Sequence, residues 1–183
     1  MPALSKQESE FHRKTAKQCF NRAWDYLDKK NRTPAEDMEM LNLAHASRYH
    51  WGLVGNARSI AVGEWQISRV YADLKQGEPS LLFAKSSLDL VRKSNLPGLL
   101  PSAYEGIARA YAVAQQHQLA REYLAKARKE LESIKDEEDQ KIYSDQINET
   151  ESLLKLKQTQ KGWDKPRKLV YFPKKAFTWD RVR

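Results

Sequence analysis

The first candidate for chemistry is Glu64, a glutamate placed where the sequence otherwise has apolar or small side chains. It lies four residues after Ile60 and four before Ser68, on the stripe of a predicted helix that should face inward. A buried carboxylate needs a partner, because burying an unpaired charge is costly or shifts its pKa. The preceding helix supplies His45 and Arg48, and we expect one of them to form a buried ion pair with it. We expect that pair to be structural rather than catalytic.

The histidines and the single cysteine do not form a recognisable site in the sequence. His45 and His50 are five residues apart, about 140° around a helix, whereas two metal ligands on one helix need a spacing of three or four. His12 and His117 are isolated in the sequence. Cys19 lies on an apolar helix stripe, which is typical of a small core residue. We therefore expect no metal site and no cofactor.

Catalytic and nucleotide-binding motifs are absent from the sequence. The patterns GxGxxG, GxxxxGKS, GxxxxGKT, GxSxG and HExxH do not occur. No pair of residues stands out as a general acid and base. We therefore expect that the protein is not an enzyme.

Residues 161–183 form a basic, aromatic C-terminal tail that carries most of the excess charge. The 183-residue chain has a net charge of +8, and this segment holds 8 lysines and arginines against 2 aspartates. Basic and aromatic residues alternate, which suits the phosphates and bases of RNA or single-stranded DNA. The alternatives are docking on the body as a cap and contact with a protein partner. The candidate contacts are Trp163, Lys165, Arg167, Lys168, Tyr171, Phe172, Lys174, Lys175, Phe177 and Trp179.

The composition of the chain is that of a helical, water-soluble protein. Charged residues make up 31% and hydrophobic residues 40%, with only 7 glycines and 7 prolines, which excludes collagen-like and low-complexity classes. No apolar run approaches the roughly 20 residues of a membrane-spanning helix. The first residues lack the apolar segment of a secretory signal, and one cysteine cannot form an internal disulfide. We expect a cytoplasmic protein with one helical domain over residues 1–160.

Seven helices are predicted from the spacing of apolar residues and from the signals at helix ends. Thr33-Pro34-Ala35-Glu36 predicts a capped helix start. Gly55-Asn56 predicts a turn in which the glycine is left-handed and the asparagine caps the next helix. Gly77 is expected to end the third helix. The expected helices span about 5–30, 34–54, 57–76, 79–95, 101–116, 118–135 and 136–161.

An internal repeat with a period of 40 residues relates two of the predicted helix pairs. The segment SRVYADLKQ at 68–76 aligns with ARAYAVAQQ at 108–116, and the arginine, tyrosine, alanine and last glutamine coincide. Small residues also recur in the second helix of each pair. Small side chains there let the two helices of a hairpin approach closely.

The repeated segments resemble the tetratricopeptide repeat (TPR), more closely at 101–135 than at 61–95. In 61–95 the first aromatic position is taken by Glu64, and the connector LPGLLP lengthens the usual period of about 34. The blocks HASRYHW and GEWQISRVYA also resemble bacterial TPR-like proteins of unassigned function. The matching residues are Tyr104, Ile107, Ala108, Tyr111, Ala120, Leu124 and Ala127 in one segment and Ile67, Ser68 and Tyr71 in the other.

The resemblance implies an all-α fold in which antiparallel helix pairs stack as a short solenoid, with a concave face lined by the first helix of each pair. It also implies a scaffold that binds a protein or peptide on that face. Because arginine pairs bidentately with carboxylates, an acidic peptide or a C-terminus is the expected ligand. Alternatively, Arg69 and Arg109 pair with neighbouring carboxylates and tether adjacent repeats. The implied groove residues are Trp65, Gln66, Arg69, Asp73, Glu105 and Arg109.

Overall fold

The structure, a computed structural model, describes residues 4–158, and within that range the chain is all-helical with no β-strand. None of the helices in the described range is long and apolar enough to cross a bilayer. The elements are α1 (Lys6–Leu27), α2 (Pro34–Val54), α3 (Ala57–Asp73), α4 (Gly77–Lys93), a short 3-10 helix η1 (Pro97–Leu99), α5 (Leu100–Val113), α6 (His117–Leu131) and α7 (Glu137–Gln158).

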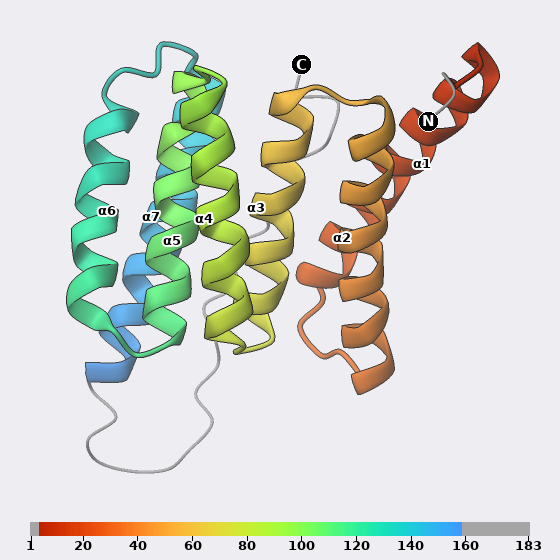
Figure 1. Cartoon of the computed structure of the whole chain (residues 1–183). Helices are drawn as coiled ribbons and strands as arrows, with labels where there is room; N and C mark the ends of the chain where they lie inside the picture. The colour runs from red at the N-terminus through yellow and green to blue at the C-terminus, as the bar shows by residue number, and fades with distance from the viewer. Residues whose placement is uncertain (1–3, 159–183) are drawn as a thin grey trace.

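Neighbouring helices pack as pairs along the chain (Figure 1). Short connections join α1 to α2, α3 to α4 and α5 to α6, and α7 packs on both α5 and α6. Figure 1 shows the pair α1–α2 at one edge of the molecule and the group α5–α7 at the other. Helices α3 and α5 touch each other, and each packs against helices on both sides: α3 against α1, α2 and α4, and α5 against α4, α6 and α7.

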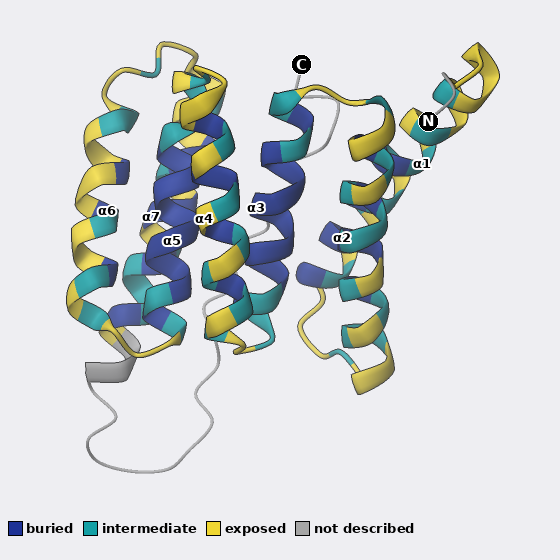
Figure 2. Ribbon diagram, in the orientation of Figure 1, coloured by how far each residue is buried: buried dark blue, intermediate teal, exposed yellow. Residues whose placement is uncertain are grey.

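Burial is concentrated on these two central helices (Figure 2). Every residue of 61–70 and of 101–110 is buried, whereas α1, α2, α4 and α6 bury mainly one face. The apolar core includes the fully buried side chains of Phe20, Met40 and Ile107. Because α3 and α5 are buried on most sides, their polar side chains must find partners inside the protein.

Two helix starts are capped as the sequence predicts. Thr33 Oγ1 accepts a hydrogen bond from the backbone N–H of Glu36, and the Glu36 carboxylate accepts one from the N–H of Thr33. This reciprocal pair is a capping box. Asn56 begins α3 in a similar way, because its Oδ1 accepts the N–H of Ser59 at 3.0 Å.

The turns that close the two central pairs have the same backbone conformation. Lys75 and Gln115, 40 residues apart, are both left-handed, with φ of 64° and 62°. In each turn the N–H of the following glutamine bonds the carbonyl of the tyrosine five residues earlier, at 2.9 Å. This is the hydrogen bond of a Schellman motif. The repeat in the sequence is therefore also a repeat in backbone geometry.

The expectations for two glycines are wrong. Gly77 does not end α3 but begins α4, where a Cβ would lie 3.0 Å from the Cβ of Ala114. Gly55 has φ of −88° and is extended rather than left-handed. The third and fifth helices also end three residues earlier than predicted. Their ends are set by Lys75 and Gln115, and neither is a residue type that marks a left-handed turn.

Candidate functional site

Two arginines of the central helices meet on one carboxylate from the last helix. The Nη2 atoms of Arg69 on α3 and Arg109 on α5 lie 2.5 and 3.3 Å from the same oxygen, Oε2 of Glu149 on α7. Arg109 also binds Oε1 of Glu105, one turn earlier on α5, at 2.7 Å. We call these four residues the arginine–carboxylate cluster. It joins three helices that are far apart in the sequence.

The arginine–carboxylate cluster is buried and its formal charges balance. The side chains of Arg69, Arg109 and Glu105 are 2%, 5% and 1% exposed, and that of Glu149 is 21% exposed. Burial alone would lower the pKa of Arg109, but Glu105 and Glu149 outweigh it, so that this pKa is raised. The guanidinium is therefore held in its charged form in the protein interior.

Further polar contacts fix α7 on α5 beside the cluster. Thr150 Oγ1 donates to Oε1 of Glu105, and Arg109 Nη2 donates to the backbone carbonyl of Gln146 at 3.3 Å. The Gln146 side chain accepts a hydrogen bond from Ser102 at 2.8 Å. These contacts fix the position of α7 on α5 more specifically than its weak apolar stripe would.

Helix α1 contacts the same stretch of α3. Gln66 donates from Nε2 to the backbone carbonyl of Phe20 at 2.9 Å. The guanidinium carbon of Arg69 lies 5.7 Å from the ring centroid of Trp24, within the range of a cation–π interaction. The ring of Trp24 in turn lies 5.9 Å from that of Trp65. The two faces of α3 near Arg69 are thus held by α1 and α7.

Three buried polar atoms in this region have no hydrogen-bond partner in the described part of the chain. They are Nη1 of Arg69, Oε1 of Gln66 and Oε2 of Glu105. Gln66 and Arg69 are three residues apart on α3 and so share a face. Because buried polar atoms in proteins are nearly always hydrogen-bonded, these are the atoms with capacity for a further ligand or a water molecule.

The expected groove residues lie in the interior rather than on an open surface. Because Arg69 and Arg109 both bind Glu149 of α7, the contacts found are those expected of a tether. Asp73 is the exception: it is partly exposed and pairs with Arg32 of the α1–α2 loop. The buried ones are Trp65, Gln66, Arg69, Glu105 and Arg109.

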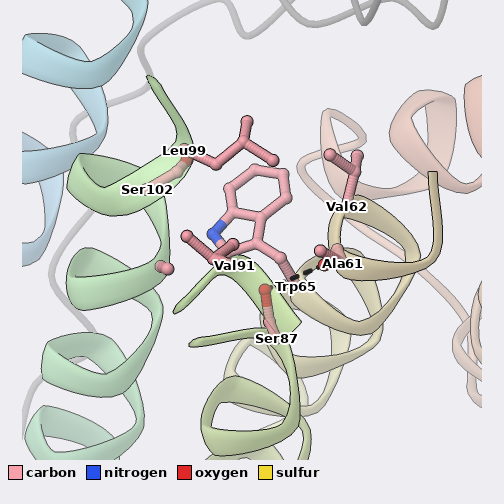
Figure 3. A pocket seen from close by; sticks show the side chains of 8 residues that line it. Ala61, Val62, Trp65, Ser87, Val91, Leu99 and Ser102 are labelled. Carbon is pink, nitrogen blue, oxygen red and sulfur yellow. Dashed lines mark hydrogen bonds between the residues drawn. The ribbon is translucent and has the colours of Figure 1, made fainter. Parts of the chain in front are cut away.

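Trp65 belongs to the apolar core between α3, α4 and α5 (Figure 3). With Leu99 and other residues it lines a cavity of about 10 Å³, which has room for a single water molecule at most. Figure 3 shows Ser87 beside it, donating to the carbonyl of Ala61 at 2.8 Å. A Cβ at Gly106 would lie 3.0 Å from Cδ1 of the indole, so the α5 backbone packs directly on the ring.

Of the two partners considered for Glu64, Arg48 makes the ion pair. Its Nε on α2 lies 2.6 Å from Oε1 of Glu64 on α3. His45 instead lies 3.2 Å from the hydroxyl of Tyr71, with the ring of Phe83 against it. Burial lowers the pKa of His45 more than the nearby carboxylate raises it.

The structure also brings together two histidines that the sequence does not relate. The Nδ1 atoms of His12 on α1 and His50 on α2 are 2.7 Å apart. No local pattern could have revealed this pair, since the contact depends on how the two helices pack. Between residues 4 and 158 there is no group of three or more His, Cys, Asp or Glu placed to hold a metal ion. Cys19 is partly buried, and burial raises the pKa of its thiol.

The proposed contacts of the C-terminal tail, residues 161–183, lie outside the described residues. No family model, curated protein or solved structure matches the chain. The TPR resemblance therefore stays a prediction, and the functional argument depends on the contacts described above.

Proposed function

We propose that this protein is a non-enzymatic, TPR-like scaffold that binds a protein or peptide through a carboxylate of that partner. The observation that carries the proposal is the convergence of Arg69 and Arg109 on one oxygen of Glu149. In this proposal the face shared by α3, α5 and α7 is the binding face. Glu149 occupies the position that the carboxylate of the partner takes.

The equivalence of the two arginines supports this function. Arg69 and Arg109 are 40 residues apart, and both precede turns of the same conformation. A repeat scaffold offers one such side chain per unit on the same face. A guanidinium presents a fork of N–H donors that matches a carboxylate, so two of them on one face favour an acidic side chain or a C-terminus.

The unused hydrogen-bonding capacity beside the cluster also supports it. Arg69 keeps a buried donor at Nη1, and Gln66 keeps a buried acceptor at Oε1 on the same face of α3. A peptide segment supplies both complementary groups, because it carries carbonyl or carboxylate oxygens and backbone N–H groups. A peptide that hydrogen-bonds both atoms would gain binding free energy, because each atom destabilises the protein when it is buried without a partner.

Access to the arginines requires movement of α7. It is the last described helix, and within the described range its backbone packs against α5 and α6, while the Arg69–Glu149 ion pair links it to α3. Glu149 is also the most exposed member of the cluster. We expect the partner's carboxylate to exchange with Glu149, so that the buried guanidiniums stay paired, because leaving a buried charge unpaired is strongly unfavourable.

Selection from a random peptide library with free C-termini, followed by calorimetry on the full chain, tests the proposal. Enriched peptides should carry an acidic residue or use their C-terminal carboxylate. Glu149→Gln removes the charge of the internal competitor, so it should tighten binding about tenfold, whereas Arg69→Gln should weaken it at least about tenfold. Arg121→Gln, exposed on α6, is the matched control for loss of a positive charge and should bind like the unaltered protein.

The same experiment separates binding from a purely structural role. If no peptide of the library is enriched, or if Glu149→Gln and Arg69→Gln bind the enriched peptides as the unaltered protein does, the cluster is a tether between helices. Circular dichroism on each variant shows whether the fold is kept. The Glu149→Gln variant is informative even where Arg69→Gln does not fold, since its expected change is a gain.

A second candidate function is association with RNA or single-stranded DNA through residues 161–183. It is favoured by the 8 basic residues of this segment and the aromatic residues between them. The test compares the full chain with a chain ending at Gln160 on a labelled oligonucleotide. Binding should require the tail and fall steeply with salt, because it would depend on phosphate contacts. Equal binding by the shortened chain would exclude this function.

A further inference from the structure

The contact between His12 and His50 joins two helices through their imidazole rings. The rings come from the second turn of α1 and the last turns of α2, 38 residues apart, with centroids 4.9 Å apart and Nδ1 atoms 2.7 Å apart. Both side chains are partly exposed, so ions from solution can reach them. The pair takes no part in the arginine–carboxylate cluster.

Two ring nitrogens this close must share one proton. One Nδ1 donates and the other accepts, since two lone pairs facing each other would repel. When the donor ring takes its other neutral tautomer, with the proton on Nε2, both Nδ1 atoms carry a free lone pair and lie 2.7 Å apart. Neutral imidazole nitrogens are the commonest protein ligands of transition metals, so the pair has the donor atoms of a two-point chelate.

We propose that His12 and His50 bind a divalent transition-metal ion of tetragonal preference, Cu²⁺ or Ni²⁺, through their Nδ1 atoms. With metal–nitrogen bonds of about 2.0–2.1 Å, a right-angled pair of ligands needs its nitrogens about 2.9 Å apart, whereas a tetrahedral pair needs about 3.4 Å. The observed separation of 2.7 Å is close to the first value. A slightly larger separation, together with a rotation of each ring that turns its lone pair from the other nitrogen toward the ion, gives this geometry.

The neighbouring side chains orient the two rings. Phe11 packs edge-on against both, with centroid distances of 5.4 Å to His12 and 6.1 Å to His50, and Tyr49 packs edge-on against His50 at 5.5 Å. Glu8 lies one turn before His12 on α1, but its carboxylate is engaged in capping the helix. In the described part of the chain the site therefore has two protein ligands, and water completes the coordination.

A metal ion at this position would clamp the first half of α1 onto α2. The two ligands belong to different helices, and in the unfolded chain they are separated by 37 intervening residues. An ion that binds the folded form in preference to the unfolded form stabilises the fold by mass action. Metal binding should therefore be visible both as heat and as a rise in the unfolding midpoint.

Titration of the tag-free full chain with CuSO₄ and NiCl₂ tests the proposal. Calorimetry should find one ion per chain, and the electron paramagnetic resonance spectrum of the Cu²⁺ form should be tetragonal with splitting from nitrogen ligands. His12→Ala and His50→Ala should each weaken binding at least about tenfold. The double variant should bind no better than either single variant. His117→Ala, on α6, is the matched control and should bind as the unaltered protein does.

Unfolding measurements give a second, independent readout. Saturating Cu²⁺ should raise the thermal midpoint of the unaltered protein and of His117→Ala, but not of His12→Ala or His50→Ala. Affinity that survives both substitutions would overturn the proposal, as would a spectrum without nitrogen splitting. Should His50→Ala fold poorly, His12→Ala and His12→Gln on the more exposed helix give the same comparison.

Discussion

Arg48 and Glu64 form an ion pair in which the acid is far more deeply buried than the base. The side chain of Glu64 is 7% exposed and that of Arg48 is 35% exposed, and Nε and Oε1 lie 2.6 Å apart. Gly63 precedes Glu64 on α3, and a Cβ there would lie 3.2 Å from the Cβ of Arg48. The missing side chain at Gly63 lets α2 approach α3 closely enough for the pair to form.

This asymmetry predicts that removing the base costs more than neutralising the acid. Arg48→Met leaves a buried carboxylate unpaired and should destabilise the fold by about 3–5 kcal/mol. Glu64→Gln leaves a guanidinium that water can reach and should cost about 1.5 kcal/mol. Urea unfolding measures both free energies. A larger loss in Glu64→Gln than in Arg48→Met would contradict the pairing described.

Gly106 is predicted to be intolerant of a methyl group. Gly106→Ala places a Cβ 3.0 Å from Cδ1 of Trp65, a buried ring with little room to move. The resulting overpacking should destabilise the fold by about 1–3 kcal/mol, as inserted methyl groups do in dense cores. Gly98→Ala is the control, since no atom lies within 4 Å of its Cβ position. Guanidinium unfolding of the two variants gives the comparison, and equal stabilities would count against the close packing at Trp65.

The two left-handed turn residues are predicted to respond alike to glycine. Lys75→Gly and Gln115→Gly should each stabilise the fold by about 0.5–1 kcal/mol, because glycine adopts φ of 64° and 62° without steric cost. Asn95→Gly, at a residue with φ of 49°, should raise stability less, because asparagine already tolerates this conformation. Thermal unfolding of the three single variants is sufficient. Opposite signs for Lys75→Gly and Gln115→Gly would show that the turns are not equivalent.

His45 is predicted to make the fold less stable in mild acid. Burial lowers its pKa in the folded protein, so the unfolded chain takes up a proton first as the pH falls below roughly 6.5. Stability from this residue is therefore complete above that pH, and it decreases as the pH falls toward the lowered folded-state pKa. The His45→Gln variant should lose less unfolding free energy than the unaltered protein between about pH 7.5 and pH 5. Denaturant unfolding at each pH measures this free energy. If His45 had no such role, the unaltered protein and His45→Gln would show the same change in stability with pH.

Local features of the fold were predictable because they depend on neighbouring residues. The capping box of Thr33 and Glu36 and the cap at Asn56 follow from side chains three residues apart. The sequence limits the partner of Glu64 to His45 or Arg48, because consecutive helices of a hairpin must face each other. The left-handed residues at Lys75 and Gln115 were not predictable, since the same side chains are common inside helices.

The environment of the candidate site was not predictable from the same reasoning. Helical spacing places Gln66 and Arg69 on one face of α3, but it says nothing about which distant segment covers that face. The contacts that cover it join residues 46 and 80 positions apart, from Gln66 to Phe20 and from Arg69 to Glu149. His12 and His50 illustrate the same limit, because their contact depends on the packing of α1 against α2.

The origin of Glu149 in the last helix has a consequence for synthesis on the ribosome. A nascent chain that ends before α7 contains Arg69, Arg109 and Glu105 but not the carboxylate that both arginines share. Until α7 covers this face, the two guanidiniums are open to water, and the cluster lacks one of its two negative charges. We therefore expect the central helices to reach their final packing only after residue 149 has left the exit tunnel. The last helix thus completes the charge balance of the interior.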